Sequence, residues 1–495
     1  MTLDRKPLPT IWVTSDGALQ EQELPDAARL DRDEWCLITD PQVRLHPGLE
    51  GIIDARCAER PEIGIFYGDE VVAQSGSAAS WLHLCKPSFD HTQIIAQDYI
   101  GWPIAIRGWA LARLGGLDRR AGSALTYDLL LRAISEGIGI ERITEVLAVH
   151  SKPPPRSNVA DRAAALERWR DRSAPGCEIR PGMAAGTFRV HRIFGTPPEV
   201  TIVVPTCQGR RGTPDGVDER KPMVVDFLES LCATEWPMER ITVLIGDDVD
   251  DGSIYEARQW PFCLERVVTR RWPGQPFNYA AKMNRLWRRA PGEYLILMND
   301  DLVVRRADWL QALMTFAVSK DVGGVGARLL YPDDRIQHAG MPAGMLGMCA
   351  HAFIGRPASA GSYQNWAEVH REWSIVTGAV FATRKSVLSQ VNGFDEKFAL
   401  DYNDVDLCLR LRLLGYRIVY TPYAELTHYE SASRGAGATP GDELALVMER
   451  WHGFMDDDPA YHPLLTRATP DVAPVAQGDA WWGTPAWRRG VSAEH

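Results

Sequence analysis

The stretch GEYLILMNDD, residues 292–301, joins an apolar run to a strongly polar ending. A short apolar run closed by polar residues is typical of a buried strand that leads into a loop. A second run of this kind, EVTIVVP at residues 199–205, is rich in β-branched side chains and closes on proline. We expect both runs to be central strands of one sheet.

Helices and strands are predicted to alternate between these two runs. The expected elements are strand 199–205, helix 223–234, strand 241–246, helix 278–289 and strand 294–298. This alternation predicts an α/β fold with a mainly parallel sheet. Ligands of such sheets bind beyond the carboxyl ends of the strands. Asp247 and Asp248 follow one strand and Asp300 and Asp301 follow another, so we expect them to meet in one crevice.

The bulk composition excludes several classes of protein. A chain of 495 residues should form two or three domains, and a net charge of −11 argues against an extended nucleic-acid surface. The nine cysteines include no CxxC pair, which favours a reducing cytoplasm over a disulfide or zinc framework. The sequence shows neither a membrane-length apolar run nor a signal-peptide core. We expect a cytoplasmic protein whose contact with the plasma membrane, if any, is peripheral at its inner face.

The chain repeats part of itself. Residues 34–49 echo 293–310, residues 100–118 echo 376–395, and residues 126–132 echo 404–410. Three matches in one order indicate that the N-terminal region is a second copy of the later half of the C-terminal domain. The residues before the first match are too few for the strands and helices of the missing half. The predicted domains are a truncated copy at 1–150, a linker with a helix at 151–198, a complete domain at 199–465 and a tail at 466–495.

Three constellations carry candidate chemistry, each with a structural alternative. Asn299-Asp300-Asp301 can hold Mg²⁺ or Mn²⁺, or can form an ordinary turn. Asp404, in the first turn of a predicted helix, can act as a base, or can belong to a set of capping acids. His428 can ligate a metal, although a lone histidine is more often structural. Arg434 can grip a diphosphate.

Taken together, these residues resemble family 2 glycosyltransferases of bacterial O-antigen and exopolysaccharide assembly, such as rhamnosyltransferase-like enzymes. The matching runs are PPEVTIVVPT (197–206), PFNYAAKMN (276–284), GEYLILMNDD (292–301), VGARLLYPDDRIQHAG (325–340), TGAVFATR (377–384), NGFDEKF (392–398), NDVDLCLRLRLLGYR (403–417), AELTHYESASRG (424–435) and DPAYHPLL (458–465). The resemblance implies a GT-A fold, which is a Rossmann-like mixed sheet, and an inverting, metal-dependent transfer from a nucleoside-diphosphate sugar to an acceptor hydroxyl.

The resemblance also implies roles for particular residues. Asp404 falls on the position of the catalytic base, with Asn403 in place of the more common Glu. Asp301 and His428 become metal ligands, for Mg²⁺ or Mn²⁺. The predicted nucleotide-sugar contacts are Pro205, Thr206, Asp247, Lys282, Asn299, Asp300 and Arg434. Asp250 and Asp251 are the alternatives to Asp247 as the acid that reads the nucleobase.

The acceptor site is less well defined by the sequence. We expect the segment 341–376 to build much of it, with Trp373 or Trp366 stacking on a sugar, unless these rings are core residues. Gly378 is assigned to the same site. The acceptor is expected to be a saccharide or a lipid-linked saccharide. Peripheral contact with the inner membrane and formation of a homodimer stay open.

The N-terminal copy is expected to be inactive. It carries Thr126 where the complete domain carries Asp404, and Thr39-Asp40-Pro41 in place of the metal motif. It can support acceptor binding or oligomerisation, or it can serve folding alone. Two further functions compete for the whole chain: a non-catalytic sugar-nucleotide-binding or scaffold protein, and a nucleotidyltransferase. The latter should carry a glycine-rich phosphate loop, which residues 205–211 do not form. The sequence leaves the donor sugar, its nucleobase and the linkage undetermined.

Overall fold

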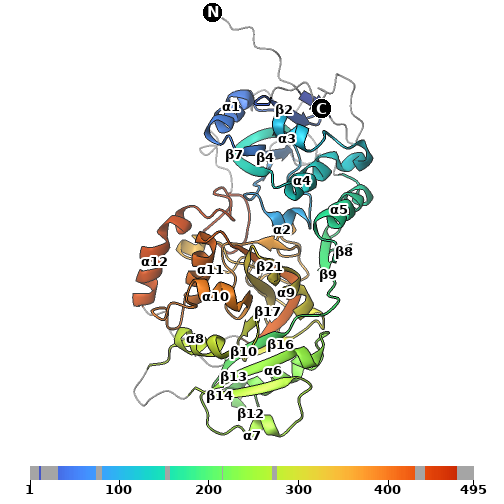
Figure 1. Cartoon of the computed structure of the whole chain (residues 1–495). Coiled ribbons are helices and arrows are strands. Elements are labelled where there is room, and N and C mark those ends of the chain that lie inside the picture. Colours follow the sequence, from blue (N-terminus) through green and yellow to red (C-terminus); the bar gives the residue numbers. More distant parts are fainter. Residues whose placement is uncertain are drawn as a thin grey trace, which may run out of the picture. The chain divides into compact units, whose positions relative to one another are not determined.

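The computed structural model describes residues 10–12, 32–73, 81–150, 157–213, 216–269, 276–429 and 441–475. These residues form two compact units (Figure 1). Unit 1 holds the described residues up to Pro181, and unit 2 holds most of those from Arg189 to Val472. Among the described helices, none is both long and apolar enough to cross a membrane.

Unit 2 is built on a ten-stranded mixed sheet. Its strands are β10 (Val200–Thr206), β13 (Ile241–Asp247), β14 (Cys263–Val268), β15 (Tyr294–Met298), β16 (Leu302–Val304), β17 (Val322–Leu330), β18 (Ile336–His338), β19 (Arg371–Glu372), β20 (Val380–Arg384) and β21 (Arg417–His428). They follow the order β14-β13-β10-β15-β20-β17-β21-β16, with β18 on β17 and β19 on β21. The first four strands of this order are parallel. The predicted α/β fold is therefore confirmed, but the sheet as a whole is mixed, as the family resemblance implies, and not mainly parallel, because β16, β18, β19 and β20 pair antiparallel with their neighbours.

Helices and a hairpin complete unit 2. They are α6 (Met223–Leu231), α7 (Ser253–Glu256), α8 (Tyr279–Arg289), α9 (Trp309–Ala317), α10 (Lys385–Gln390), α11 (Asn403–Leu413), α12 (Gly441–Asp456) and the strand pair β11 (Arg210–Thr213) and β12 (Gly216–Pro222). Helix α8 packs on β10 and β13. It comes so close that a Cβ on Gly246 would lie 2.4 Å from Leu286 Cδ1. Only a glycine permits this approach, which brings Lys282 of α8 to the carboxyl ends of the strands.

Unit 1 contains a seven-stranded sheet of related design. Its elements are β1 (Thr10–Trp12), β2 (Trp35–Thr39), β3 (Arg44–Leu45), α1 (Leu49–Glu59), β4 (Ile63–Ala73), β5 (Trp81–Leu84), α2 (His91–Ile94), β6 (Ile104–Arg107), α3 (Gly108–Arg113), α4 (Leu125–Ser135), β7 (Gly139–His150) and α5 (Val159–Ser173). Strands β8 (Cys177–Pro181) and β9 (Phe188–Arg192) follow at the junction of the units.

The two sheets repeat one strand order. In unit 1 it runs β1-β2-β6-β4-β7-β3 with β5 on β4, and in unit 2 β10-β15-β20-β17-β21-β16 with β18 on β17. The sense of every corresponding pair, parallel or antiparallel, is the same. In the described part of unit 1, no strand lies beyond β1, where unit 2 continues with β13 and β14.

The strand registers refine the correspondence by one residue. Trp35 lies opposite Arg107 in unit 1, just as Tyr294 lies opposite Arg384 in unit 2. Counting from these pairs places the sequence 40–42, which reads Asp-Pro-Gln, on Asn299-Asp300-Asp301. The predicted equivalent, Thr39-Asp40-Pro41, was therefore shifted by one position. Proline and glutamine, not carboxylates, stand where unit 2 has its two acids.

Helix α5 also belongs to the repeat, although its region was predicted to be a linker. In unit 1, Asp128 accepts hydrogen bonds from Arg132 and from Arg168 of α5. In unit 2, Asp406 accepts from Arg410 and from Arg450 of α12. In each copy the last helix is thus anchored to a buried acid at the corresponding position. Helix α5 also packs against α4 of unit 1.

Candidate functional site

The carboxyl ends of β10, β13 and β15 bring several of the predicted residues together. Thr206 Oγ1 donates to Asp300 Oδ2 at 2.6 Å. Lys282 Nζ donates to the carbonyl oxygen of Thr206 at 2.9 Å and lies 2.8 Å from Asp248 Oδ1. Pro205 precedes Thr206 in β10, opposite Gly246 of β13. A cation, a hydroxyl and two carboxylates therefore lie at one edge of the sheet.

Asp300 is the most perturbed acid of this group. Burial and the neighbouring charge of Asp301 raise its pKa to about 7, against the hydrogen bond from Thr206 and the charge of Lys282. A buried carboxylate with an elevated pKa has a strong preference for a nearby cation or a proton. Such perturbed acids in a crevice are candidates for functional residues.

Asp301 and His428 face each other across the turn after β15. His428 Nε2 lies 3.1 Å from Asp301 Oδ1, and this oxygen is buried with no hydrogen-bond partner among the described residues. His428 Nδ1 lies 2.6 Å from Gln337 Oε1. An amide oxygen only accepts, so Nδ1 of His428 carries a proton, and Nε2 is the ring nitrogen near Asp301.

This pair fits a hard divalent cation. Two ligands at about 2.1 Å from an octahedral ion, at right angles, lie about 3 Å apart, which matches the separation of the two atoms. An orphaned carboxylate oxygen next to an imidazole lone pair places two acceptors in contact, an arrangement that a shared cation would stabilise. The hydrogen bond from Nδ1 to Gln337 is the kind of support that metal-ligating histidines use.

Asp404 is held by backbone groups at the start of α11. Its Oδ2 accepts the N–H of Gly378 at 2.7 Å, and its Oδ1 accepts the N–H of Val405 at 2.8 Å. The helix begins after Tyr402, which has a left-handed φ of 56° and no side-chain capping bond. Through Oδ1, Asp404 also satisfies an N–H of the first turn of α11, so the capping role and the role of base both stay predictions for this residue.

Two adjacent hydrogen bonds connect this acid to the metal motif. The N–H of Asn299 donates to the carbonyl oxygen of Ala379 at 3.1 Å. Gly378, the preceding residue, donates to Asp404. The side chain of Asn299 accepts from Tyr279 OH at 3.4 Å. The motif after β15 and the acid on α11 thus meet at the start of β20.

Asp247 does not face the crevice as predicted. Its carboxylate is fully buried and accepts from Gln208, Tyr255 and Arg266 at 2.9 to 3.0 Å. The backbone N–H of Val249 donates to it as well, at 3.0 Å, so Asp247 organises the end of β13 through groups of the protein itself. Gln208 and Arg266 are the side chains it holds in place.

Trp373 is also a correction. It is fully buried, with Arg371 over its ring at 3.9 Å and Tyr461 stacked on it at 6.5 Å between centroids. Trp366 is equally buried, so neither ring can stack on a sugar. Gly378 stays at the site through its bond to Asp404. Arg434, predicted as a diphosphate contact, lies outside the described residues.

Sequence reasoning missed Gln337, His338 and Arg266. The first two belong to the run RIQHAG, which matches the family but carries no charge pattern that indicates a role. Arg266 lies in β14, where a basic residue on an edge strand is unremarkable. Their contacts join residues far apart in the sequence, and no local pattern records them.

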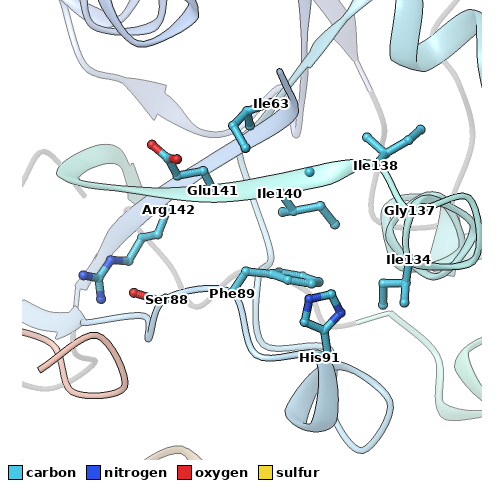
Figure 2. Close-up of a pocket in the computed structure, with 11 residues that line it drawn as sticks. Ile63, Ser88, Phe89, His91, Ile134, Gly137, Ile138, Ile140, Glu141 and Arg142 are labelled. Carbon is cyan, nitrogen blue, oxygen red and sulfur yellow. The ribbon is translucent and has the colours of Figure 1, made fainter. Parts of the chain in front are cut away.

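Described residues of unit 1 line a cavity, whereas the groups above belong to unit 2. It has a volume of about 460 Å³ between the start of β7 and the segment before α2 (Figure 2). Phe89 and His91 form one wall and Ile140 another, with Arg142 and Ser88 towards one end. It opens at the amino ends of β4 and β7, the opposite edge of the sheet from the one that carries acids in unit 2. We therefore assign it no part in the chemistry of that site.

The fold and the site together define a class of protein. A parallel core followed by the antiparallel β20, with acids after β15 and an acid at the start of α11, is a GT-A fold. The chain belongs to glycosyltransferase family 2, since the family model described as "Glycosyltransferase like family 2" matches residues 197–451.

Two relatives resemble the chain over most of its length, and a third resembles a short part of it. The O-antigen biosynthesis protein RfbC of Myxococcus xanthus is 30% identical over 431 residues, which are 83% of this chain and 32% of that protein. The uncharacterized protein y4gI of Sinorhizobium fredii is 30% identical over 467 residues, 89% of this chain and 49% of that protein. The chain thus spans half or less of the length of these relatives. The rhamnosyltransferase WbbL of Escherichia coli is 42% identical over 52 residues, 10% of this chain and 20% of that protein.

Among solved structures, the mannosyltransferase PcManGT of Pyrobaculum calidifontis, in complex with GDP-Man and Mn²⁺, is 16% identical with a TM-score of 0.33. It covers 67% of this chain and 81% of its own. TarS of S. aureus, in complex with UDP-GlcNAc, is 15% identical with a TM-score of 0.36, covering 52% and 67%. We transfer no residue role from likenesses of this size.

Proposed function

We propose that unit 2 is an inverting glycosyltransferase that moves a sugar from a nucleoside-diphosphate sugar to a hydroxyl of a saccharide acceptor in the assembly of a bacterial surface polysaccharide. Membership of family 2 supports the reaction class, and the names of the relatives support the pathway. The observation that carries the proposal is the pair of adjacent hydrogen bonds, Asn299 to Ala379 and Gly378 to Asp404, which joins the metal motif to the acid on α11.

On the donor side, the chain supplies a hydroxyl and a buried cation. Thr206 and Lys282 would line the diphosphate, and Asp300, bonded to Thr206, would contact the ribose or the sugar. A Mg²⁺ or Mn²⁺ ion held by Asp301 and His428 would supply the positive charge that stabilises the departing diphosphate. Arg434 would add a further positive charge, by resemblance to the family.

On the acceptor side, Asp404 would act as the general base. Two backbone N–H groups fix its carboxylate, and each oxygen keeps a lone pair that can accept the proton of the acceptor hydroxyl. Attack by that hydroxyl on the face opposite the departing diphosphate inverts the anomeric centre. The acceptor that we propose is a saccharide, free or lipid-linked, met at the inner face of the plasma membrane by a cytoplasmic enzyme. Unit 1 takes no part in the transfer.

Exchange of Asp404 tests the proposal. Asp404→Asn keeps the size and the backbone contacts but cannot take a proton, so turnover should fall by about 10²-fold or more while donor binding is retained. Turnover is measured by mass spectrometry of products and of released nucleoside diphosphate across a panel of sugar nucleotides.

Asp40→Asn makes the same chemical exchange in unit 1, at the position that corresponds to Asn299, and as the control it should leave turnover intact. Near-normal turnover in Asp404→Asn would contradict the assignment of the base. If the unmodified protein binds a sugar nucleotide but releases no diphosphate with any acceptor, the chain is a binding or scaffold protein instead.

A further inference from the structure

Strand β18 presents two consecutive side chains to the two ends of the site. Gln337 and His338 are 2% and 0% exposed, so neither is a surface residue. The strand is itself fixed, since β18 pairs with β17 through Leu329 opposite His338. Buried polar side chains in such a strand are expected to be satisfied by specific partners. Their partners here are the groups around the proposed metal and the proposed base.

Gln337 determines the protonation pattern of His428. Its Oε1 accepts from Nδ1 of His428 at 2.6 Å, which assigns the proton to Nδ1. Nε2 is then the ring nitrogen available to a metal ion, and it lies 3.1 Å from Asp301 Oδ1. Without this bond the ring could rotate or place its proton on Nε2, and a proton there would exclude a metal ion.

His338 acts at the other end of the site, where Asp404 lies. Its Nε2 accepts the N–H of Thr377 at 3.4 Å, and Thr377 precedes Gly378, whose N–H holds Asp404. Because Nε2 accepts, the proton of neutral His338 is on Nδ1, which lies 3.0 Å from Nδ1 of His351 and donates to it. Burial, and after it the neighbouring His351 and His428, hold the pKa of His338 well below its usual value, so the ring stays neutral.

We propose that Gln337 and His338 are positioning residues that align the metal ligands with the general base. This inference rests on the function proposed above. Gln337 fixes the tautomer of His428, and His338 fixes the peptide that carries the Gly378 N–H to Asp404. Because the two residues are neighbours in one strand, a single rigid element sets the separation of the two halves of the site. The competing explanation is that both side chains only fill the core.

Binding of Mn²⁺ in the absence of any sugar nucleotide tests the first half. By isothermal titration calorimetry, Gln337→Leu should weaken Mn²⁺ binding by about 10- to 100-fold, the usual effect of losing a partner of a metal-ligating histidine. Gln337→Glu keeps an acceptor for Nδ1–H and should retain most of the affinity. In a His428→Ala background, Gln337→Leu should cause no further loss, because Gln337 acts through His428.

Turnover tests the second half. His338→Phe should leave Mn²⁺ affinity within about twofold and lower kcat by about tenfold, as expected for a misplaced general base. His338→Gln offers an amide oxygen near the position of Nε2 and should recover part of that loss. In an Asp404→Asn background, His338→Phe should have no additional effect on kcat.

His370→Phe is the matched control for both halves. His370 is also a buried histidine of unit 2, but it packs between Phe316 and Tyr423. Its exchange should change neither Mn²⁺ affinity nor kcat.

Equal effects of Gln337→Leu with and without His428, or of His338→Phe with and without Asp404, would show that the residues only support packing and would overturn the inference. An unmodified protein that binds no Mn²⁺ would overturn the metal site itself and the inference with it. If Gln337→Leu binds Mn²⁺ as tightly as the unmodified protein does, the inference is overturned and the metal site is not.

Discussion

Two acids on one helix show that the surroundings of a carboxylate determine its role. Asp404 and Asp406 are two positions apart on α11, and each carries a carboxylate. Asp406 is fully buried and bonded to Arg410, Arg450 and the Trp451 indole, so it anchors α12. Asp404 is partly exposed and accepts the backbone N–H groups of Gly378 and Val405. Of the two, Asp404 alone is placed to receive a proton from a bound molecule.

Asp300 leads to a prediction about pH. Its pKa is about 7 in the folded protein, well above the ordinary value of an aspartate, so the native state holds a proton that the unfolded chain has lost. The stability that Asp300 contributes to the metal-free protein should therefore be present at about pH 4 and decline as the pH rises towards about 7. Thermal unfolding in EDTA between these pH values measures this decline.

Asp300→Asn is the reference for that experiment, since an amide does not titrate. The unmodified protein should lose more stability than the variant between pH 4 and pH 7, with no further divergence above that range. A pH dependence that is the same in both proteins would show that Asp300 is ionised throughout.

The sequence predicts the residues of the site unevenly. The strand at 294–298 is correct to the residue because a short, bounded apolar run has few alternatives. Strand β21 continues to His428 because β16 and β17 pair with its last residues, and these pairings join segments far apart in the sequence. Asp404 could be separated from its acidic neighbours only through the resemblance to a family. Gln337 could not be found, because its partner lies 91 positions away.

At the scale of elements, the buried acid of α4 and α11 is the feature that both copies share. Asp128 and Asp406 are 1% and 0% exposed, and each joins an arginine of its own helix to one from the terminal helix of its unit. The repeat of strand order was visible as sequence echoes. That α5 belongs to the repeat was not visible in the sequence, because its one matching feature is a single arginine within a charged helix.

This arrangement predicts matched losses of stability. Asp128→Ala and Asp406→Ala each leave two arginines without their common partner, and each should lower the free energy of unfolding of its own unit by about 3 kcal/mol. Chemical denaturation followed by hydrogen exchange of each unit measures this. If Asp128→Ala left α5 as protected as before, α5 would be held by other contacts.

At the scale of the whole molecule, the two units surround a corresponding histidine with different charged groups. His150 of unit 1 corresponds to His428 in the sheet register, and its Nε2 lies 2.8 Å from Glu70 Oε2. The buried ammonium of Lys86 bonds to Glu70 and to the carbonyl oxygen of Ile100. Although burial raises the pKa of Glu70, Lys86 and His150 hold it below its usual value. Unit 1 therefore carries its own cation where we propose that unit 2 takes a metal.

Calorimetry can test whether Mn²⁺ stabilises unit 2 and not unit 1. Mn²⁺ at about 100 times its Kd should stabilise unit 2 by about 2.7 kcal/mol and leave the unfolding of unit 1 unchanged. Lys86→Met strands the buried Glu70 carboxylate and should destabilise unit 1 by about 3 to 5 kcal/mol in EDTA and in Mn²⁺ alike. Arg120→Met, which breaks an exposed pair with Asp118, is the control and should move neither transition. Stabilisation of unit 1 by Mn²⁺ would mean that it, too, has a metal site.

The left-handed backbone of Tyr402 has a consequence for how this enzyme can evolve. A tyrosine in that conformation is strained relative to glycine or asparagine by about 1 kcal/mol. Selection for thermostability alone would favour those residues at position 402, two positions before the proposed base. Selection for rate would favour whichever side chain keeps α11 in register with Gly378. Heat tolerance and turnover would then compete at a residue that need not touch either substrate.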